Sequence, residues 1–108
     1  MRILFDQGTP VAIRNAFRGH VVRTANEEGW STLSNGELLR VAEEAGFEVL
    51  LTTDTGLPDQ QNLKGRRLAV VILNKNRWIL IKARMQEIVA AVNAAKPGAY
   101  SVVEIPER

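Results

Sequence analysis

Short apolar runs that end abruptly in polar residues divide the chain into segments. The clearest strand candidate spans residues 49–52, where an apolar run ends abruptly in two hydroxyls and a carboxylate, at Thr52, Thr53 and Asp54. A second run, residues 2–5, is followed directly by Asp6. Continuous apolar runs of this length are typical of strands buried on both faces, as in a parallel sheet. The pattern therefore predicts two buried strands, each ending in an aspartate.

Three further strands follow from the same pattern. Residues 20–24 are rich in β-branched side chains, residues 68–73 form the longest apolar run, and residues 100–105 form a last strand that we expect at a sheet edge. Residues 57–65 are a polar connection with room for one helical turn.

Helices are predicted between these strands. Thr9 and Pro10 are typical of an N-cap and a first helical position, which predicts a short helix over residues 10–17. Ser34 and Glu37 have the spacing of a capping box at the start of a second helix, which Gly46 ends. A third helix, starting at residue 79 or 82 and ending at residue 95, carries one apolar stripe. Its members are Ile81, Met85, Ile88, Val89 and Val92.

This alternation of strands and helices predicts an α/β fold with a mostly parallel central sheet of about five strands, in a single domain over residues 1–108. In such doubly wound sheets, ligands bind at the carboxyl ends of the strands, beside the point where the strand order reverses. If the first and third strands are neighbours there, Asp6 and Asp54 face each other.

Composition limits the chemistry. The chain has no cysteine, which excludes disulfides, thiolate nucleophiles and thiolate metal ligands. Its longest apolar run has six residues, against about 20 for a membrane span, and its N-terminus enters a strand without a signal-peptide pattern. We therefore expect a soluble cytoplasmic protein.

Charge is unevenly distributed along the chain. Eight of the twelve acids lie in residues 27–59, whereas residues 60–86 contain seven basic residues and no acid. This pattern is typical of a polyanion-binding surface beside a carboxylate site, or of two ordinary solvated faces. If it binds nucleic acid, the residues expected to contact phosphates are Lys64, Arg66, Arg67, Lys75 and Arg77.

Three carboxylates are the candidate catalytic groups: Asp6, Glu37 and Asp54. Each also has a structural interpretation, since the two aspartates could form turns and Glu37 could only cap its helix. Asp59 is a weaker fourth candidate. Carboxylates in one cavity repel each other unless a cation neutralises them, and oxygen ligands suit Mg²⁺ or Mn²⁺, with Asp6 and Asp54 as metal ligands. The chemistry that such a site supports is phosphodiester hydrolysis by metal-activated water.

Two other classes share single features with this chain. Residues 54–56 read Asp-Thr-Gly, as in aspartic proteases, but those are all-β proteins and the helical signals here argue against them. Receiver domains also end their third strand in an aspartate. They carry an acidic pair after the first strand, where this chain has Asp6 followed by Gln7.

Four segments together resemble the short bacterial PIN-like family of unknown function: residues 2–7, 19–24, 33–39 and 49–54. Residues 60–63 and the strand at 68–73 are similar to one subgroup of that family. The resemblance implies a three-layer α/β/α PIN-like sandwich. It also implies an Mg²⁺- or Mn²⁺-dependent ribonuclease, often the toxin of a toxin–antitoxin pair.

Under this resemblance, Asp6 and Asp54 match the strand-end acids of the family and Glu37 matches an acid of its helix motif. Two positions differ, because Gln7 and Asn35 stand where the family commonly has acids. Two hypotheses follow: a metal-dependent ribonuclease, or a non-catalytic PIN-like module that binds RNA or a small antitoxin-type protein. We also expect the chain to form a homodimer.

Overall fold

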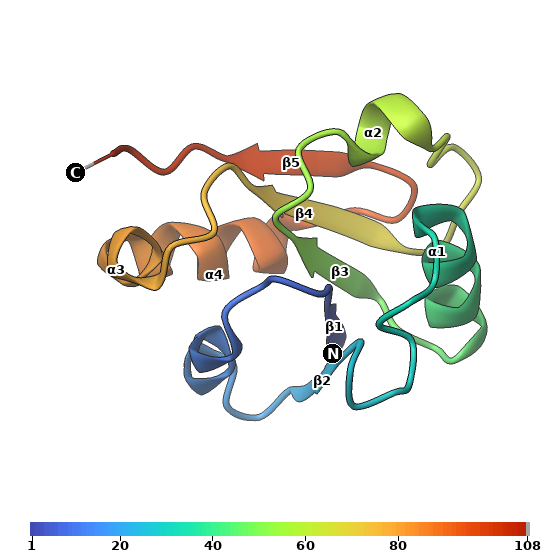
Figure 1. The fold of residues 1–108 in the computed structure, drawn as a ribbon, viewed down its shortest axis with the longest axis horizontal. Coiled ribbons are helices and arrows are strands. Elements are labelled where there is room, and N and C mark those ends of the chain that lie inside the picture. The colour runs from blue at the N-terminus through green and yellow to red at the C-terminus, as the bar shows by residue number, and fades with distance from the viewer. Residues whose placement is uncertain (108) are drawn as a thin grey trace.

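The computed structural model describes residues 1–107 and contains one five-stranded sheet in which every strand pair is parallel. The strand order is β2-β1-β3-β4-β5 (Figure 1). The α/β class and the parallel sheet of five strands, predicted from the apolar runs, are confirmed. The strands are β1 (Arg2–Phe5), β2 (Val21–Thr24), β3 (Val49–Thr52), β4 (Ala69–Leu73) and β5 (Tyr100–Val103).

Helices cover both faces of this sheet, which gives three layers (Figure 1). One face packs against α1 and α2, and the other packs against the 3-10 helix η1 together with α3 and α4. Their bounds are η1 (Val11–Ala16), α1 (Asn35–Glu44), α2 (Leu57–Gln60), α3 (Trp78–Ile81), η2 (Lys82–Arg84) and α4 (Met85–Ala94). No helix in residues 1–107 is long and apolar enough to cross a membrane.

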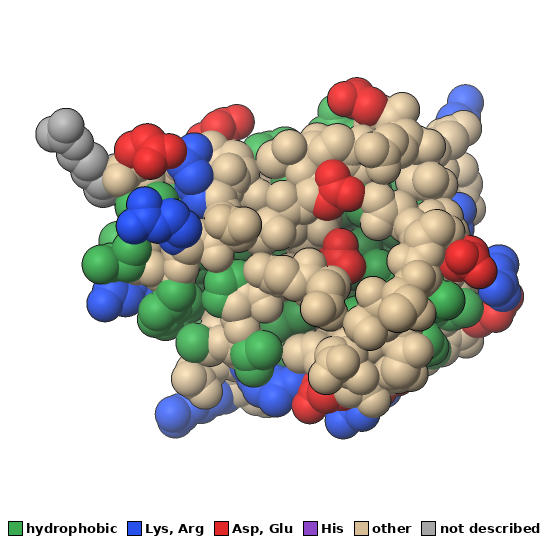
Figure 2. Space-filling view, in the orientation of Figure 1, with side chains coloured by type: hydrophobic (Ala, Val, Ile, Leu, Met, Phe, Trp, Pro, Cys, Tyr) green, Lys and Arg blue, Asp and Glu red, His purple; other side chains and the backbone are tan. Residues whose placement is uncertain are grey.

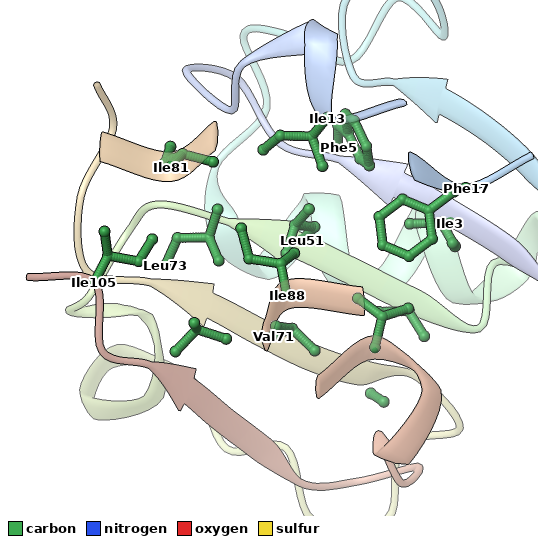
Figure 3. Packing of buried hydrophobic residues seen from close by; sticks show 14 residues of the cluster. Ile3, Phe5, Ile13, Phe17, Leu51, Val71, Leu73, Ile81, Ile88 and Ile105 are labelled. Carbon is green, nitrogen blue, oxygen red and sulfur yellow. The ribbon is translucent and has the colours of Figure 1, made fainter. Parts of the chain in front are cut away.

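The core is divided by the sheet into two clusters, because successive strand residues point to opposite faces. Leu50 and Val70 face α1 and α2, whereas Leu51 and Val71 face α4. Figure 3 shows the second of these clusters, in which Ile88 of α4 lies over the middle of the sheet. All residues of β3 and β4 are buried, which explains their unbroken apolar runs.

The predicted start of the first helix is wrong. Residues 11–16 form a 3-10 helix, and Thr9 does not cap it. The Thr9 hydroxyl instead donates a hydrogen bond of 3.2 Å to the backbone oxygen of Leu51, and Thr9 is buried. The hydroxyl thus ties the loop after β1 to the end of β3, while Pro10 occupies the N-cap position of the 3-10 helix.

The last predicted helix is divided into α3, η2 and α4 rather than continuous. The break falls at Arg84, whose backbone (φ −125°, ψ 25°) leaves the helical region. Ile81 of α3 lies toward the end of the sheet near Leu73 and Ile105, while Ile88 of α4 lies over its middle (Figure 3). The change of direction at η2 lets both segments pack on the twisted sheet.

Other predicted boundaries are confirmed. Ser34 accepts a hydrogen bond from the Glu37 amide while the Glu37 carboxylate accepts from the Ser34 amide, which completes the capping box of α1. Gly46 ends that segment with φ +85°, a conformation that glycine adopts without strain. Strand β5 lies at a sheet edge, as its position at the end of the sequence predicts.

Candidate functional site

The carboxyl ends of β1 and β3 lie side by side, at the point where the strand order reverses. From β1 the chain goes to β2 on one side, and later to β3 on the other. Phe5 pairs with Leu51, and the Asp6 amide donates a hydrogen bond of 2.9 Å to the Leu51 oxygen. The predicted adjacency of these strands is confirmed, and it brings Asp6 beside the end of β3.

One buried hydroxyl connects the two aspartates. The Thr52 Oγ1 donates a hydrogen bond of 2.7 Å to Asp6 Oδ2 and accepts one of 3.1 Å from the Asp54 amide. Thr52 is fully buried, so this hydroxyl has no water to replace either partner. The threonine therefore fixes the orientation of the Asp6 carboxylate relative to the turn that carries Asp54.

The Asp6 carboxyl lies in a partly desolvated position. Its pKa is raised above the usual 3.8, chiefly because burial disfavours the charged form. Hydrogen bonds from the Thr52 hydroxyl and from the Gln7 amide oppose this shift, and the negative charge of Asp54 adds to it. The charge of Asp54 therefore acts on Asp6, although burial is the main cause of the raised pKa.

Asp54 is held by amide donors rather than by a cation side chain. Its Oδ1 accepts a hydrogen bond of 2.9 Å from the Gly56 amide, which closes the turn after β3. Its Oδ2 accepts one of 2.8 Å from Asn35 Nδ2, at the start of α1. The same nitrogen donates to Gln60 Oε1 at 3.2 Å, so that Asn35 links Asp54 to the end of α2.

Glu37 has a different environment from the one expected of a member of the acidic centre. Its Oε1 lies 3.0 Å from Ser34 Oγ, within the capping box, and the residue is exposed. The structure brings Asn35 to Asp54 instead. Asn35, Thr52 and Gln60 are the site residues that sequence reasoning missed. The sequence signals for them were the difference at Asn35 from the resembled PIN-like family, the position of Thr52 at the strand end, and the similarity of residues 60–63 to one subgroup of that family.

The predicted basic surface is divided between the two ends of the sheet. Arg66 and Arg67 precede β4. The Arg66 side chain pairs with Glu43 near the end of α1 at 3.7 Å, and the Arg67 backbone amide donates to the same carboxylate. Lys75 follows β4, at the opposite end, and pairs with Glu107 at 3.4 Å. The five residues of β4 separate these groups by roughly 15 Å. The expected set therefore does not form one continuous patch.

The remaining members of the basic set follow the same division. Lys64 belongs to the connection before β4, and Arg77 occupies the N-cap of α3 beyond its other end. Figure 2 shows acidic side chains near the middle of one face, surrounded by uncharged atoms, with Lys and Arg around the margin. Asp59, the fourth acidic candidate, lies in α2 and lines a separate cavity rather than contacting either aspartate.

The donor set at this edge is made of hard oxygen ligands. Within residues 1–107 no group of three or more acidic, histidine or cysteine side chains converges as a metal site. Two carboxylates nevertheless lie together, and each of their oxygens accepts one of the hydrogen bonds described above, which leaves further lone pairs. Mg²⁺ and Mn²⁺ suit such oxygens, and Mg²⁺ is commonly held by one or two carboxylates, with water and phosphate completing the shell.

The fold and the site together define an all-parallel α/β protein with a threonine-bridged aspartate pair at the topological switch point. Comparisons with protein-family models, curated proteins and solved structures give no match.

Proposed function

We propose that this protein is a PIN-like, Mg²⁺- or Mn²⁺-dependent ribonuclease centred on Asp6 and Asp54. The observation that carries the proposal is the pair itself: two aspartates at the ends of adjacent parallel strands, with one buried threonine hydroxyl bonded to the Asp6 carboxylate and to the Asp54 amide. Ligand sites of open parallel sheets lie at this position. The site is thus in the place, and has the ligand type, that a phosphate-bound cation needs.

The protein side chains would have distinct roles in such a centre. Asp6 and Asp54 would hold the cation, which when bound supplies a polarised phosphate and an acidified water. Thr52 would keep the Asp6 carboxylate in a fixed orientation, and Asn35 would do the same for Asp54. Because burial raises the pKa of Asp6, cation binding must compete with its protonation and should strengthen as the pH rises.

The proposal is tested by cleavage of labelled single-stranded RNA in Mg²⁺ or Mn²⁺. We expect Asp6→Asn and Asp54→Asn to lower the cleavage rate by at least about 100-fold, since each removes a carboxylate that holds the cation. Glu87→Gln is the control, because it removes one carboxylate charge from an exposed position on α4, which packs on the opposite face of the sheet from α1 and α2. Urea unfolding of each variant would establish that the fold is retained.

A wild-type protein that cleaves no RNA with either metal would contradict the nuclease proposal. Cleavage that survives both site substitutions at the wild-type rate would contradict it equally, since the activity would then belong to another site or to a contaminant.

A second candidate function has one observation in its favour. The Asn35 amide donates to Asp54 at the position where the resembled family commonly has a third acid. A pair held by an amide suits a non-catalytic PIN-like module that binds RNA or a small antitoxin-type protein without turnover. For RNA, affinity should fall steeply between about 50 and 200 mM salt, because phosphate contacts release counterions. Binding that is insensitive to salt would indicate the protein partner instead.

A further inference from the structure

A cavity of about 700 Å³ lies beside α2, on the face of the sheet that α1 and α2 cover. It is lined by the last residues of α2, by the connection that follows, and by the start of β5. A volume of this size lies within the range of small-ligand sites. It is separate from the aspartate pair, although the two share a boundary at Gln60.

The shortness of α2 opens this cavity. Val103 of β5 packs in the core on the α4 side, so Tyr100 and Val102 point to the other face. There, α2 has only four residues, and these two side chains remain 54% and 41% exposed. A tyrosine ring thus forms one wall of an open, preformed cavity.

Amide side chains also line the cavity, and α1 contacts two of them. Gln60 Oε1 accepts a hydrogen bond of 3.2 Å from Asn35, the first residue of α1. Gln61 packs on Gly36, where a Cβ atom would lie only 3.2 Å from Gln61 Oε1. Glycine at position 36 therefore leaves the space that Gln61 occupies.

The connection beyond α2 adds a third amide and a cation. Asn62 Oδ1 accepts a hydrogen bond of 3.0 Å from the Lys64 amide, which shapes the turn. The Lys64 side chain is exposed and forms no ion pair with any side chain in residues 1–107. The cavity therefore combines a tyrosine, three amides, an available ammonium group and the Asp59 carboxylate.

The cavity is also close to the aspartate pair. Asn35 Nδ2 donates to both Asp54 Oδ2 and Gln60 Oε1, so these two acceptors lie within two hydrogen-bond lengths, roughly 6 Å. A chain molecule that occupies the cavity with one unit can present its next unit to the carboxylates.

We propose that this cavity binds one base of a single-stranded RNA and so positions the neighbouring phosphate at the aspartate pair. The proposal rests on the ribonuclease function proposed above. Tyr100 stacks on the base, and Gln60, Gln61 and Asn62 meet donors and acceptors on its edge, the contacts by which proteins recognise unpaired RNA bases. Lys64 contacts a flanking phosphate.

The test measures binding separately from cleavage. A fluorescein-labelled adenylate pentamer is titrated with protein in EDTA, where no divalent cation is available, and anisotropy gives the dissociation constant. Tyr100→Ala should weaken binding roughly 5- to 150-fold, the effect of removing one stacked base. Tyr100→Phe keeps the ring and should stay within about threefold of the wild type. Ser101→Ala is the matched control, since it changes the adjacent strand residue on the other face.

A second measurement locates the ligand. In ¹⁵N-resolved spectra, adenosine monophosphate should shift the side-chain amides of Gln60, Gln61 and Asn62, which line the cavity. Tyr100→Ala should reduce these shifts.

The outcomes separate the two proposals. If pentamer binding depends on Tyr100 but the wild type never cleaves RNA, the base site stands and the ribonuclease function fails. If RNA is cleaved but Tyr100→Ala binds the pentamer as tightly as the wild type, the base site is refuted. It is equally refuted if Tyr100→Ala changes only the oligomeric state, since the exposed edge strand β5 would then contact a second copy of the chain.

Discussion

The Thr52 hydroxyl offers the sharpest test of how the site is built. Thr52→Val keeps the shape of a fully buried side chain and removes only its hydrogen-bonding group. Asp6 then loses a donor at 2.7 Å, and the Asp54 amide loses an acceptor at 3.1 Å. A hydrogen bond to a charged group contributes about 1.5–3 kcal/mol and a neutral one about 1 kcal/mol, so we expect the free energy of unfolding to fall by roughly 2–4 kcal/mol.

The cost should depend on pH. Burial already raises the pKa of Asp6, and loss of the Thr52 bond, which lowers it, raises it further. A carboxyl group whose pKa is higher in the folded state than in the unfolded state favours folding when it is protonated. This contribution to the free energy of unfolding is fully present below the unfolded pKa of 3.8 and is lost as the pH rises through the folded pKa. The deficit of Thr52→Val should therefore be larger at about pH 7.5 than at about pH 4.

Urea unfolding followed by circular dichroism gives the free energies, and Thr52→Ser is the matched control. Serine keeps the hydroxyl and loses one buried methyl group, at a cost of about 1 kcal/mol that should not vary with pH. In an Asp6→Asn background, much of the charge-dependent cost should disappear, as a double-mutant cycle would measure. A valine variant that loses less than about 0.5 kcal/mol at both pH values would refute the bridging role of this hydroxyl.

Three more predictions concern the surroundings of the pair. Asp6→Asn should make the protein more stable than the wild type near pH 7.5, with the advantage disappearing toward pH 3.8, because the substitution removes a partly buried charge; urea unfolding across this pH range checks it. Ser34→Ala should lower the free energy of unfolding by about 1 kcal/mol, because it breaks the capping box. Glu37→Gln should keep both the cap and the affinity for Mn²⁺. A large loss of Mn²⁺ binding in Glu37→Gln, measured by calorimetry, would show that Glu37 belongs to the metal centre. Without metal, Asn35→Asp should lower the free energy of unfolding by about 1.5–3 kcal/mol, since a hydrogen bond to Asp54 becomes a repulsion. The same variant should bind Mn²⁺ roughly tenfold more tightly, and unchanged affinity would place the cation elsewhere.

Much of the fold is readable from local pattern. The apolar run that ends at Thr52 predicts β3 with its observed bounds, because both faces of that strand are buried. The apolar runs also predict that Asp6 and Asp54 lie at the same end of the sheet, since neighbouring parallel strands have their carboxyl ends on the same side.

The rest depends on distances that a linear pattern does not contain. Asn35 reaches Asp54 because of the path of the loop before α1. Two residues further on, the Glu37 side chain instead contacts Ser34 in the capping box. The basic residues between positions 64 and 77 do not form one continuous surface, for a similar reason. They are close in sequence, but β4 runs between Arg66 and Lys75 and carries them to opposite ends of the sheet.

The strand order has a consequence for how the molecule is made. Strand β1 is flanked by β2 and β3, and β4 and β5 then add outward in turn. Every strand, taken in the order of synthesis, therefore joins an edge that already exists, and none has to insert between two partners that are already paired. During translation the chain can extend its sheet from the N-terminus onward, as each new strand emerges from the ribosome, without undoing any earlier pairing. This order limits the time for which an unpaired apolar strand is exposed to other chains, which is the step at which parallel sheets are most prone to aggregate.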